Sequence, residues 1–208
     1  MKIVVIDYDA GNTANVLRAL AKLGIQAQLS ADPQVLAEAD GLILPGVGAF
    51  ASAMTELEKR GLIEPIQTAV AKGKPLLGIC LGMQILLEQG LEHGQTPGLG
   101  LIPGVCRPIP SQPSFPVPHM GWNDLEVKKA SSLTAGLEGQ AVYFVHSYYT
   151  DVPEGYIDVT ADYGLEIPAM IHRDLVFGAQ FHPEKSGQVG LGILQAFSEV
   201  IYANSTRH

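Results

Sequence analysis

The chain has 208 residues, a length that fits one sizeable domain better than two. Hydrophobic residues make up 47% and charged residues 16%, a balance that excludes intrinsic disorder and supplies a full core. The formal net charge is −8, and no run of Lys or Arg is longer than Lys128-Lys129, whereas a nucleic-acid partner normally requires clustered basic side chains. We therefore expect residues 1–208 to form one domain that does not bind nucleic acid.

Short apolar runs alternate with helical patterns in the first half of the sequence. Residues 2–7 predict a buried strand, and residues 12–23 predict a helix because Val16 and Leu20 recur at helical spacing. Further strands are expected at residues 25–29, 41–44 and 75–79, and further helices at residues 50–59, 63–71 and 81–89. Strands that are apolar on both faces and alternate with helices predict a parallel sheet covered on both sides.

The second half has a different pattern. Residues 97–128 are rich in Pro and Gly and contain short strand-like pieces. Strands are expected at residues 142–146, 157–160, 169–172 and 176–181, and a last helix at about residues 188–202. The expected fold class is α/β, with a mixed, mainly parallel central sheet flanked by helices and with short antiparallel strands added in the second half. Ligand sites in such folds gather at the carboxyl ends of the parallel strands, where Pro45 and Cys80 fall.

The sequence predicts neither a membrane span nor a secretion signal. No stretch approaches the ~18 apolar residues that a spanning helix needs, and the apolar run at residues 3–6 is too short for a signal-peptide core. Cys80 and Cys106 are the only cysteines, which are too few for a disulfide framework. We therefore expect a cytoplasmic protein that does not associate with a membrane and whose thiols stay free.

Residues 78–82 are the most informative segment for chemistry. They read Gly-Ile-Cys-Leu-Gly and join a strand to a helix, in the Gly-x-nucleophile-x-Gly form of a hydrolase elbow. A sharp turn lifts Cys80 out of the sheet in such an elbow, and the flanking glycines remove side chains that would clash there. The helix N-terminus favours a thiolate, and the Leu81 amide would face a developing oxyanion. The alternative is a buried cysteine that serves as a small apolar core residue.

His182-Pro183-Glu184 follows the last expected strand. Residues i and i+2 of an extended segment face the same way, and Pro183 biases His182 away from helix. A thiol beside a histidine that a third group orients is the general arrangement of an activated thiol. The alternative is a surface turn without a role, but both this unit and the elbow end apolar strands of one sheet. Cys80 and His182 alone provide too few ligands for a metal site.

These segments resemble the class I (triad) glutamine amidotransferases over nearly the whole chain. The blocks that carry the resemblance are residues 45–50 (Pro-Gly-Val-Gly-Ala-Phe), 78–84 (Gly-Ile-Cys-Leu-Gly-Met-Gln) and 181–184 (Phe-His-Pro-Glu). The fold that this family implies is a mixed sheet flanked by helices. Within the family, the chain resembles the glutaminase subunits that serve histidine biosynthesis. This closer likeness is carried by residues 6–12, 119–123 and 144–148 and by Lys185-Ser186, with a departure at Asp9, where a small residue is expected.

The resemblance implies that the chain hydrolyses L-glutamine to L-glutamate and ammonia, without a metal or an organic cofactor. Cys80 would be the nucleophile, His182 the general base and Glu184 the group that orients the imidazole. The resemblance assigns the oxyanion hole to Val47, Gly48 and Leu81, and glutamine binding to Gly46, Gln84, Ser147 and Tyr148. His146 either has a direct role or is a hydrogen-bonded strand histidine.

The resemblance also implies a partner, because nothing in the chain remains to form an acceptor-substrate domain. The partner would be the cyclase subunit (HisF), which uses ammonia to form imidazole glycerol phosphate and aminoimidazole carboxamide ribonucleotide, in a heterodimer with this chain. Residues 7–12, residues 119–123 and Lys185 are the interface we expect. Two alternatives are a glutaminase subunit of another synthase and a non-enzymatic protein that uses the elbow cysteine as a redox sensor. The second alternative gives no reason for the His-Pro-Glu unit.

Overall fold

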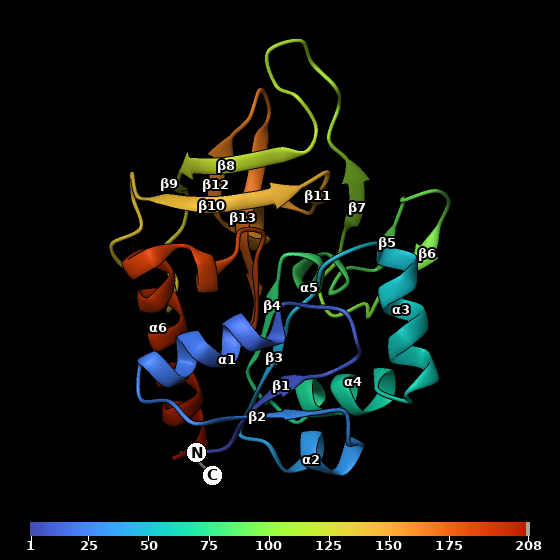
Figure 1. The fold of residues 1–208 in the computed structure, drawn as a ribbon, viewed down its shortest axis with the longest axis vertical. Helices are drawn as coiled ribbons and strands as arrows, with labels where there is room; N and C mark the ends of the chain where they lie inside the picture. Colours follow the sequence, from blue (N-terminus) through green and yellow to red (C-terminus); the bar gives the residue numbers. More distant parts are fainter. Residues whose placement is uncertain (207–208) are drawn as a thin grey trace.

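An 8-stranded mixed sheet forms the centre of the computed structural model, which describes residues 1–206 (Figure 1). In spatial order its strands are β2 (Ala27–Ser30), β1 (Ile3–Ile6), β3 (Gly41–Leu44), β4 (Leu76–Ile79), β14 (Val176–Ala179), β13 (Glu166–Arg173), β12 (Ile157–Asp162) and β9 (Glu126–Val127). The strands from β2 to β14 run parallel, and those from β14 to β9 pair antiparallel. The mixed, mainly parallel α/β fold predicted from the sequence is therefore confirmed.

Helices cover both faces of this sheet (Figure 1). One face carries α1 (Thr13–Lys22) and α6 (Gly187–Ser205), and the other carries α2 (Pro33–Glu38), α3 (Phe50–Lys59) and α4 (Ile63–Ala71). Side chains of β1 alternate between the two layers: Val4 and Ile6 pack with α2, α3 and α4, whereas Ile3 and Val5 pack with α1 and α6. Burial on both faces explains why these strands appear as continuous apolar runs in the sequence.

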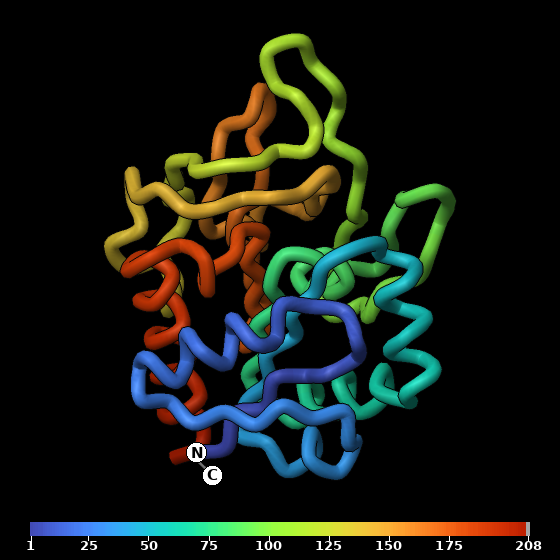
Figure 2. The backbone as a smooth tube through the Cα atoms, viewed as in Figure 1, coloured from blue at the N-terminus to red at the C-terminus, as the bar shows by residue number. Residues whose placement is uncertain are grey.

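Short strands from residues 89–151 form two smaller sheets. One pairs β8 (His119–Asp124) with β10 (Ala141–His146), and the other has the order β11 (Tyr148–Asp151), β7 (Val105–Pro108), β5 (Gln89–Gly90) and β6 (Thr96–Pro97). The segment between β7 and β8 projects from the top of the molecule in Figure 2. Most pairings in these sheets are antiparallel, as the sequence predicts, although β5 pairs parallel with β7. The β11 strand was not predicted.

The helix predicted at residues 81–89 is much shorter in the structure, where α5 spans only Leu81–Gln84. The carbonyl groups that would continue the helix are taken by a distant segment. Leu99 N donates to Ile85 O at 2.8 Å, and Leu101 N donates to Leu86 O at 2.8 Å. The apolar side chains that resemble a helical face in the sequence are instead buried in this tertiary pairing.

Two further differences concern the edge of the sheet. The strand predicted at residues 25–29 spans Ala27–Ser30, and helix α2 follows it without having been predicted. A start signal for α2 is present, because Asp32 accepts a hydrogen bond from Gln34 N at 2.8 Å and Pro33 occupies the first helical position. Within residues 1–206, no helix combines the length and apolar character needed to cross a membrane.

Candidate active site

Cys80 occupies the sharp turn between β4 and α5. Its backbone lies at φ 55° and ψ −112°, a conformation that costs a non-glycine residue roughly 1–3 kcal/mol. The turn is held by a hydrogen bond from Cys80 N to Ala179 O at 2.7 Å. A Cβ atom at Gly78 would stand 2.6 Å from Gly82 O, and one at Gly82 would stand 1.8 Å from Leu44 O. The prediction that side chains at Gly78 and Gly82 would clash at the elbow is therefore confirmed.

His182 and Glu184 form a buried pair at the end of β14. His182 Nδ1 lies 2.8 Å from Glu184 Oε1, and the two side chains are only 2% and 1% exposed. The local geometry differs from the prediction, since β14 ends at Ala179 and Glu184 lies in a 3-10 turn, Pro183–Lys185, instead of an extended segment. The backbone of His182 is held in place because Ser186 Oγ donates to His182 O at 2.6 Å.

The charge state of His182 reflects its two neighbours. Burial lowers the pKa of His182, but interactions with Cys80 and Glu184 raise it by more, to about 9. His182 Nε2 is buried and has no hydrogen-bond partner of good geometry among residues 1–206. The raised pKa therefore favours an imidazolium at His182, whose unpaired Nε2 can hold and release a proton.

Cys80 and His182 meet in one cavity of about 440 Å³ at the carboxyl ends of β3 and β4. Of the other residues proposed from the sequence, those that line the same cavity are Val47, Gly48, Leu81, Gln84, Ser147 and Tyr148. Gly46 does not line it. A Cβ atom at Gly46 would stand 2.6 Å from Tyr8 Oη and 3.0 Å from Leu81 Cβ, so this residue packs behind the elbow. Tyr8 holds this loop because its hydroxyl donates to Pro45 O at 2.7 Å.

Sequence reasoning missed several residues that contribute to the cavity. Glu92, Pro118 and Val145 line it, and His146, left open from the sequence, lines it too. Glu92 is also tied to the loop after β3, since Phe50 N donates to its Oε2 at 2.7 Å. No local pattern assigns these positions to the cavity, because they belong to loops and to small sheets that only the fold brings to the elbow.

Gln180 was also missed. It is buried directly behind the elbow, where its Nε2 lies 3.8 Å from Cys80 Sγ and its Oε1 accepts a hydrogen bond from Gln84 Nε2 at 3.0 Å. A buried Gln two positions before His182 was the signal that could have identified it, because an amide placed among apolar residues requires partners.

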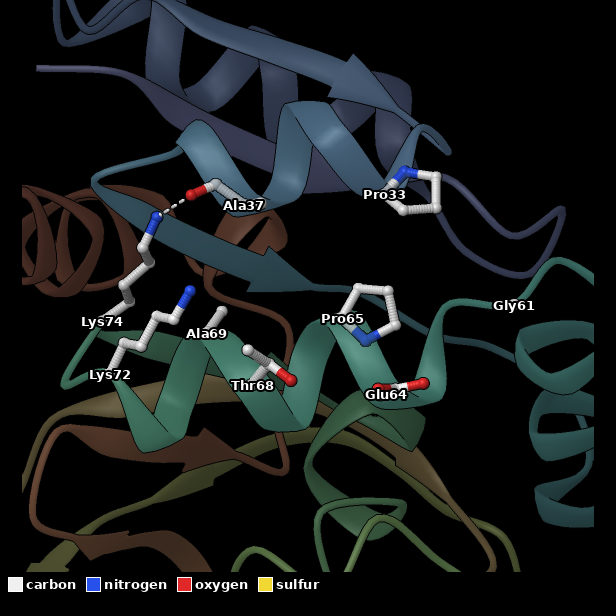
Figure 3. A pocket seen from close by; sticks show the side chains of 9 residues that line it. All are labelled: Pro33, Ala37, Gly61, Glu64, Pro65, Thr68, Ala69, Lys72 and Lys74. Carbon is white, nitrogen blue, oxygen red and sulfur yellow. Dashed lines mark hydrogen bonds between the residues drawn. The ribbon is translucent and has the colours of Figure 1, made fainter.

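Cys106, the second cysteine, does not line this cavity. It is buried in β7, and burial raises the pKa of its thiol. A separate hollow of about 340 Å³ lies between α2 and α4 (Figure 3). Lys74 crosses it to donate from Nζ to Ala37 O, and neither cysteine nor histidine lines it. Of these two hollows, only the cavity at the elbow brings a cysteine and a histidine together.

Comparison with known proteins agrees with this geometry. Residues 4–198 match the family model described as glutamine amidotransferase class-I. Over 99% of both chains, the sequence is 74% identical to "Imidazole glycerol phosphate synthase subunit HisH" of Streptococcus sanguinis. It is 54% identical to the protein of the same name from Listeria monocytogenes, over 97% of both chains.

The fold is also found among solved structures. A structure described as a glutamine amidotransferase superposes with a TM-score of 0.76 at 21% identity, covering 96% of this chain and 98% of the other. At this identity the likeness supports the fold alone. The family follows from the sequence matches, and the chain belongs to the class-I glutamine amidotransferases, among the relatives of the HisH subunits of imidazole glycerol phosphate synthase.

Proposed function

We propose that the chain hydrolyses L-glutamine through Cys80, His182 and Glu184 and delivers the ammonia to a cyclase partner. The observation that carries this proposal is the meeting of Cys80 and His182, from different strands, in one cavity, with Glu184 bonded to the far side of the imidazole. The proposal places the chain in the cytoplasm, because a reactive thiol stays reduced in that compartment. Residues 1–208 act as a single domain.

The reaction begins with attack of the Cys80 thiolate on the side-chain amide carbon of glutamine. The carbonyl π bond opens to an oxyanion, and the tetrahedral intermediate then collapses with cleavage of the C–N bond. His182 Nε2 gives its proton to the departing nitrogen, which leaves as ammonia. Water attacks the resulting thioester while His182 accepts a proton, and glutamate departs as the C–S bond breaks. Glu184 keeps the imidazole in the orientation that presents Nε2 to the cavity.

The oxyanion would be held by backbone amides on both sides of the thiol. Leu81 N is the first amide of α5, and Val47 and Gly48 line the same cavity. None of the three amides donates a hydrogen bond to a group within residues 1–206. Amides that are free and fixed before the reaction stabilise the charge that develops in the transition state.

The rest of the cavity is suited to the polar end of an amino acid. Glu92 offers a carboxylate to the α-ammonium group of glutamine, and Ser147 and Tyr148 offer backbone groups. Gln84 helps to hold Tyr148 in place, since its Nε2 donates to Tyr148 O at 3.0 Å. Gly46 contributes indirectly by setting the path of the loop that carries Val47.

The partner would dock over β8 and β10, where apolar side chains remain uncovered. Met120 and Trp122 are 61% and 59% exposed on β8. The Trp122 ring meets Tyr143 edge-on at 6.2 Å, and Lys185 Nζ lies 5.9 Å from the centre of the Tyr143 ring. Exposed aromatic and methionine side chains beside a cation are typical of a protein interface. The HisH relatives are subunits of imidazole glycerol phosphate synthase, which supports a cyclase subunit as the partner.

The test is ammonia release from glutamine, measured with and without the cyclase subunit and its ribonucleotide ligand. We expect hydrolysis that rises sharply when both are present. Hydrolysis that ignores the cyclase would leave the glutaminase reaction intact and overturn the histidine-pathway partner. If no condition gives hydrolysis, the glutaminase proposal fails and a redox role for the elbow cysteine takes its place.

A further inference from the structure

A series of side-chain hydrogen bonds leads inward from the β8–β10 sheet. Asn123 Nδ2 donates to Asp162 O at 2.8 Å and lies 3.3 Å from His119 Nε2. His119 Nδ1 lies 2.9 Å from His146 Nε2, and His146 Nδ1 lies 2.7 Å from Tyr148 O. The two histidines face each other directly across the antiparallel pair of strands. The outer sheet is thus connected to the cavity wall at Tyr148.

The groups at the two ends of this series, the Asn123 amide and the Tyr148 carbonyl, determine which nitrogen of each imidazole carries the proton. An amide nitrogen can only donate, so His119 Nε2 must accept from Asn123, and a carbonyl oxygen can only accept, so His146 Nδ1 must donate to Tyr148. It follows that His119 Nδ1 carries a proton and donates it to His146 Nε2. Burial lowers the pKa of His119 to about 4 and that of His146 to about 3, which keeps both rings neutral. Each ring therefore has its proton on Nδ1.

A second set of bonds continues from Tyr148 to the nucleophile. Tyr148 O also accepts a hydrogen bond from Gln84 Nε2 at 3.0 Å, and the same nitrogen donates to Gln180 Oε1 at 3.0 Å. Gln180 then directs its Nε2 at Cys80 Sγ, 3.8 Å away. Each amide has only one orientation that satisfies both of its neighbours. The two sets converge on the Tyr148 carbonyl oxygen, which accepts one hydrogen bond from each.

His119 is fixed in place although it does not line the cavity. Its ring is stacked between Phe144, at 4.6 Å between centroids, and Tyr163, at 3.9 Å. A nearly buried ring held on both faces can rotate little, so its Nδ1 proton stays aimed at His146. Without that donor, His146 Nε2 would be a buried acceptor lacking a partner. The His146 imidazole could then carry its proton on Nε2 instead of Nδ1, and its hydrogen bond to Tyr148 O would be lost.

We propose that His119 is a positioning residue for glutamine hydrolysis: together with His146 it holds the Tyr148 carbonyl, and thereby the cavity wall and the Gln84–Gln180 amides that face the Cys80 thiol. The inference rests on the proposed function. It gives a role to a histidine that touches neither the substrate cavity nor the thiol.

The first test replaces His119 with Phe, which retains a ring between Phe144 and Tyr163 but removes both nitrogens. The matched control is His172→Phe, because His172 is also a strand histidine, with its Nδ1 2.6 Å from Asp158 Oδ2, and is not part of this series of bonds. In complex with the cyclase, H119F should lower kcat for ammonia release roughly tenfold or more, as expected when a reacting group is displaced. H172F should lower Tm while leaving kcat unchanged.

A second readout is the rate at which iodoacetamide alkylates Cys80, followed by mass spectrometry of the peptide that contains it. H119F should slow this reaction, because the Gln180 amide no longer supports the thiolate, and H172F should not. If H119F matches H172F within about twofold in both kcat and alkylation rate, the proposal is overturned. Alkylation requires no glutamine turnover. It therefore tests the role of His119 even if wild-type protein releases no ammonia and the proposed function fails.

A spectroscopic measurement covers the case in which H119F does not fold. Nitrogen-15 NMR of histidine-labelled wild-type protein distinguishes the two neutral tautomers. His119 and His146 should both carry their proton on Nδ1 at neutral pH. A proton on Nε2 of either ring would contradict the series of bonds on which the proposal rests.

Discussion

Gly82, in the first turn of α5, lies directly against the carbonyl of Leu44, the last residue of β3. A Cβ atom built on Gly82 would stand 1.8 Å from Leu44 O, far inside the contact distance of carbon and oxygen. The obstacle is backbone and cannot rotate away. The close approach brings the end of β3, and the loop that follows it, to the elbow that carries Cys80.

Replacing Gly82 with Ala should therefore destabilise the protein strongly, by about 3 kcal/mol or more, since overpacking against backbone forces the two elements apart. The control is Gly192→Ala on α6, where nothing lies within 4 Å of the added Cβ. That exposed helical substitution should stabilise by about 0.5–1 kcal/mol. Urea unfolding of both variants measures the difference, and equal stabilities would contradict the packing described for the elbow.

Replacing Cys80 with Ala should abolish ammonia release while leaving glutamine binding measurable by calorimetry, because only the nucleophile is lost. Cys106→Ala is the matched control, since this second thiol is buried in β7 outside the cavity. The control variant should keep its turnover. Residual turnover in the Cys80 variant comparable to that of wild type would mean that another group attacks glutamine.

Replacing Glu184 with Gln should lower kcat by about a hundredfold or more, because the imidazole loses the carboxylate that fixes its orientation and stabilises its charge. The pKa of His182, measured by NMR, should fall from about 9 toward its ordinary value, since Glu184 is one of the groups that raise it. Glu199→Gln on the exposed face of α6 is the control. A Glu184 variant with unchanged kcat would remove this residue from the triad.

The raised pKa of His182 gives stability a definite dependence on pH. The ordinary pKa is 6.5 and the value in the folded protein is about 9, so the folded state binds the proton more tightly. The resulting stabilisation is complete below about pH 6.5 and disappears as the pH rises through about 9. The difference in unfolding free energy between wild type and His182→Asn should shrink across that interval in urea titrations. A difference that grows as the pH rises would contradict a raised pKa of His182 in the folded protein.

Replacing Trp122 with Ala should weaken binding of the cyclase subunit by about 2 kcal/mol or more, because exposed tryptophans commonly anchor protein interfaces. Tyr202→Ala is the control, since Tyr202 is equally exposed but lies at the end of α6, away from β8. Calorimetry or surface binding with purified cyclase gives both affinities. Equal affinities for the two variants would move the interface away from β8.

The sequence by itself determined the elements whose causes are local. The strands β1, β3 and β4 are short apolar runs with a polar residue, a proline or Cys80 at each boundary. The helices α3 and α4 match their predicted limits because helical spacing and the neighbouring breaks are visible in the chain. The elbow around Cys80 and the His182–Glu184 unit were identifiable for the same reason. In each, the residues that suggest the chemistry lie within five or fewer consecutive positions, 78–82 and 182–184.

The tertiary structure decided what depends on distant partners. The helix after Cys80 ends at Gln84 because amides from residues 99–102 take the carbonyls that would extend it, and no local pattern records that competition. Glu92, His146 and Gln180 reach the site from a loop, a small sheet and a buried strand end. The roles of His146 and Gln180 follow from their burial, because a polar side chain removed from water must find a partner, and the fold alone determines which partner is within reach.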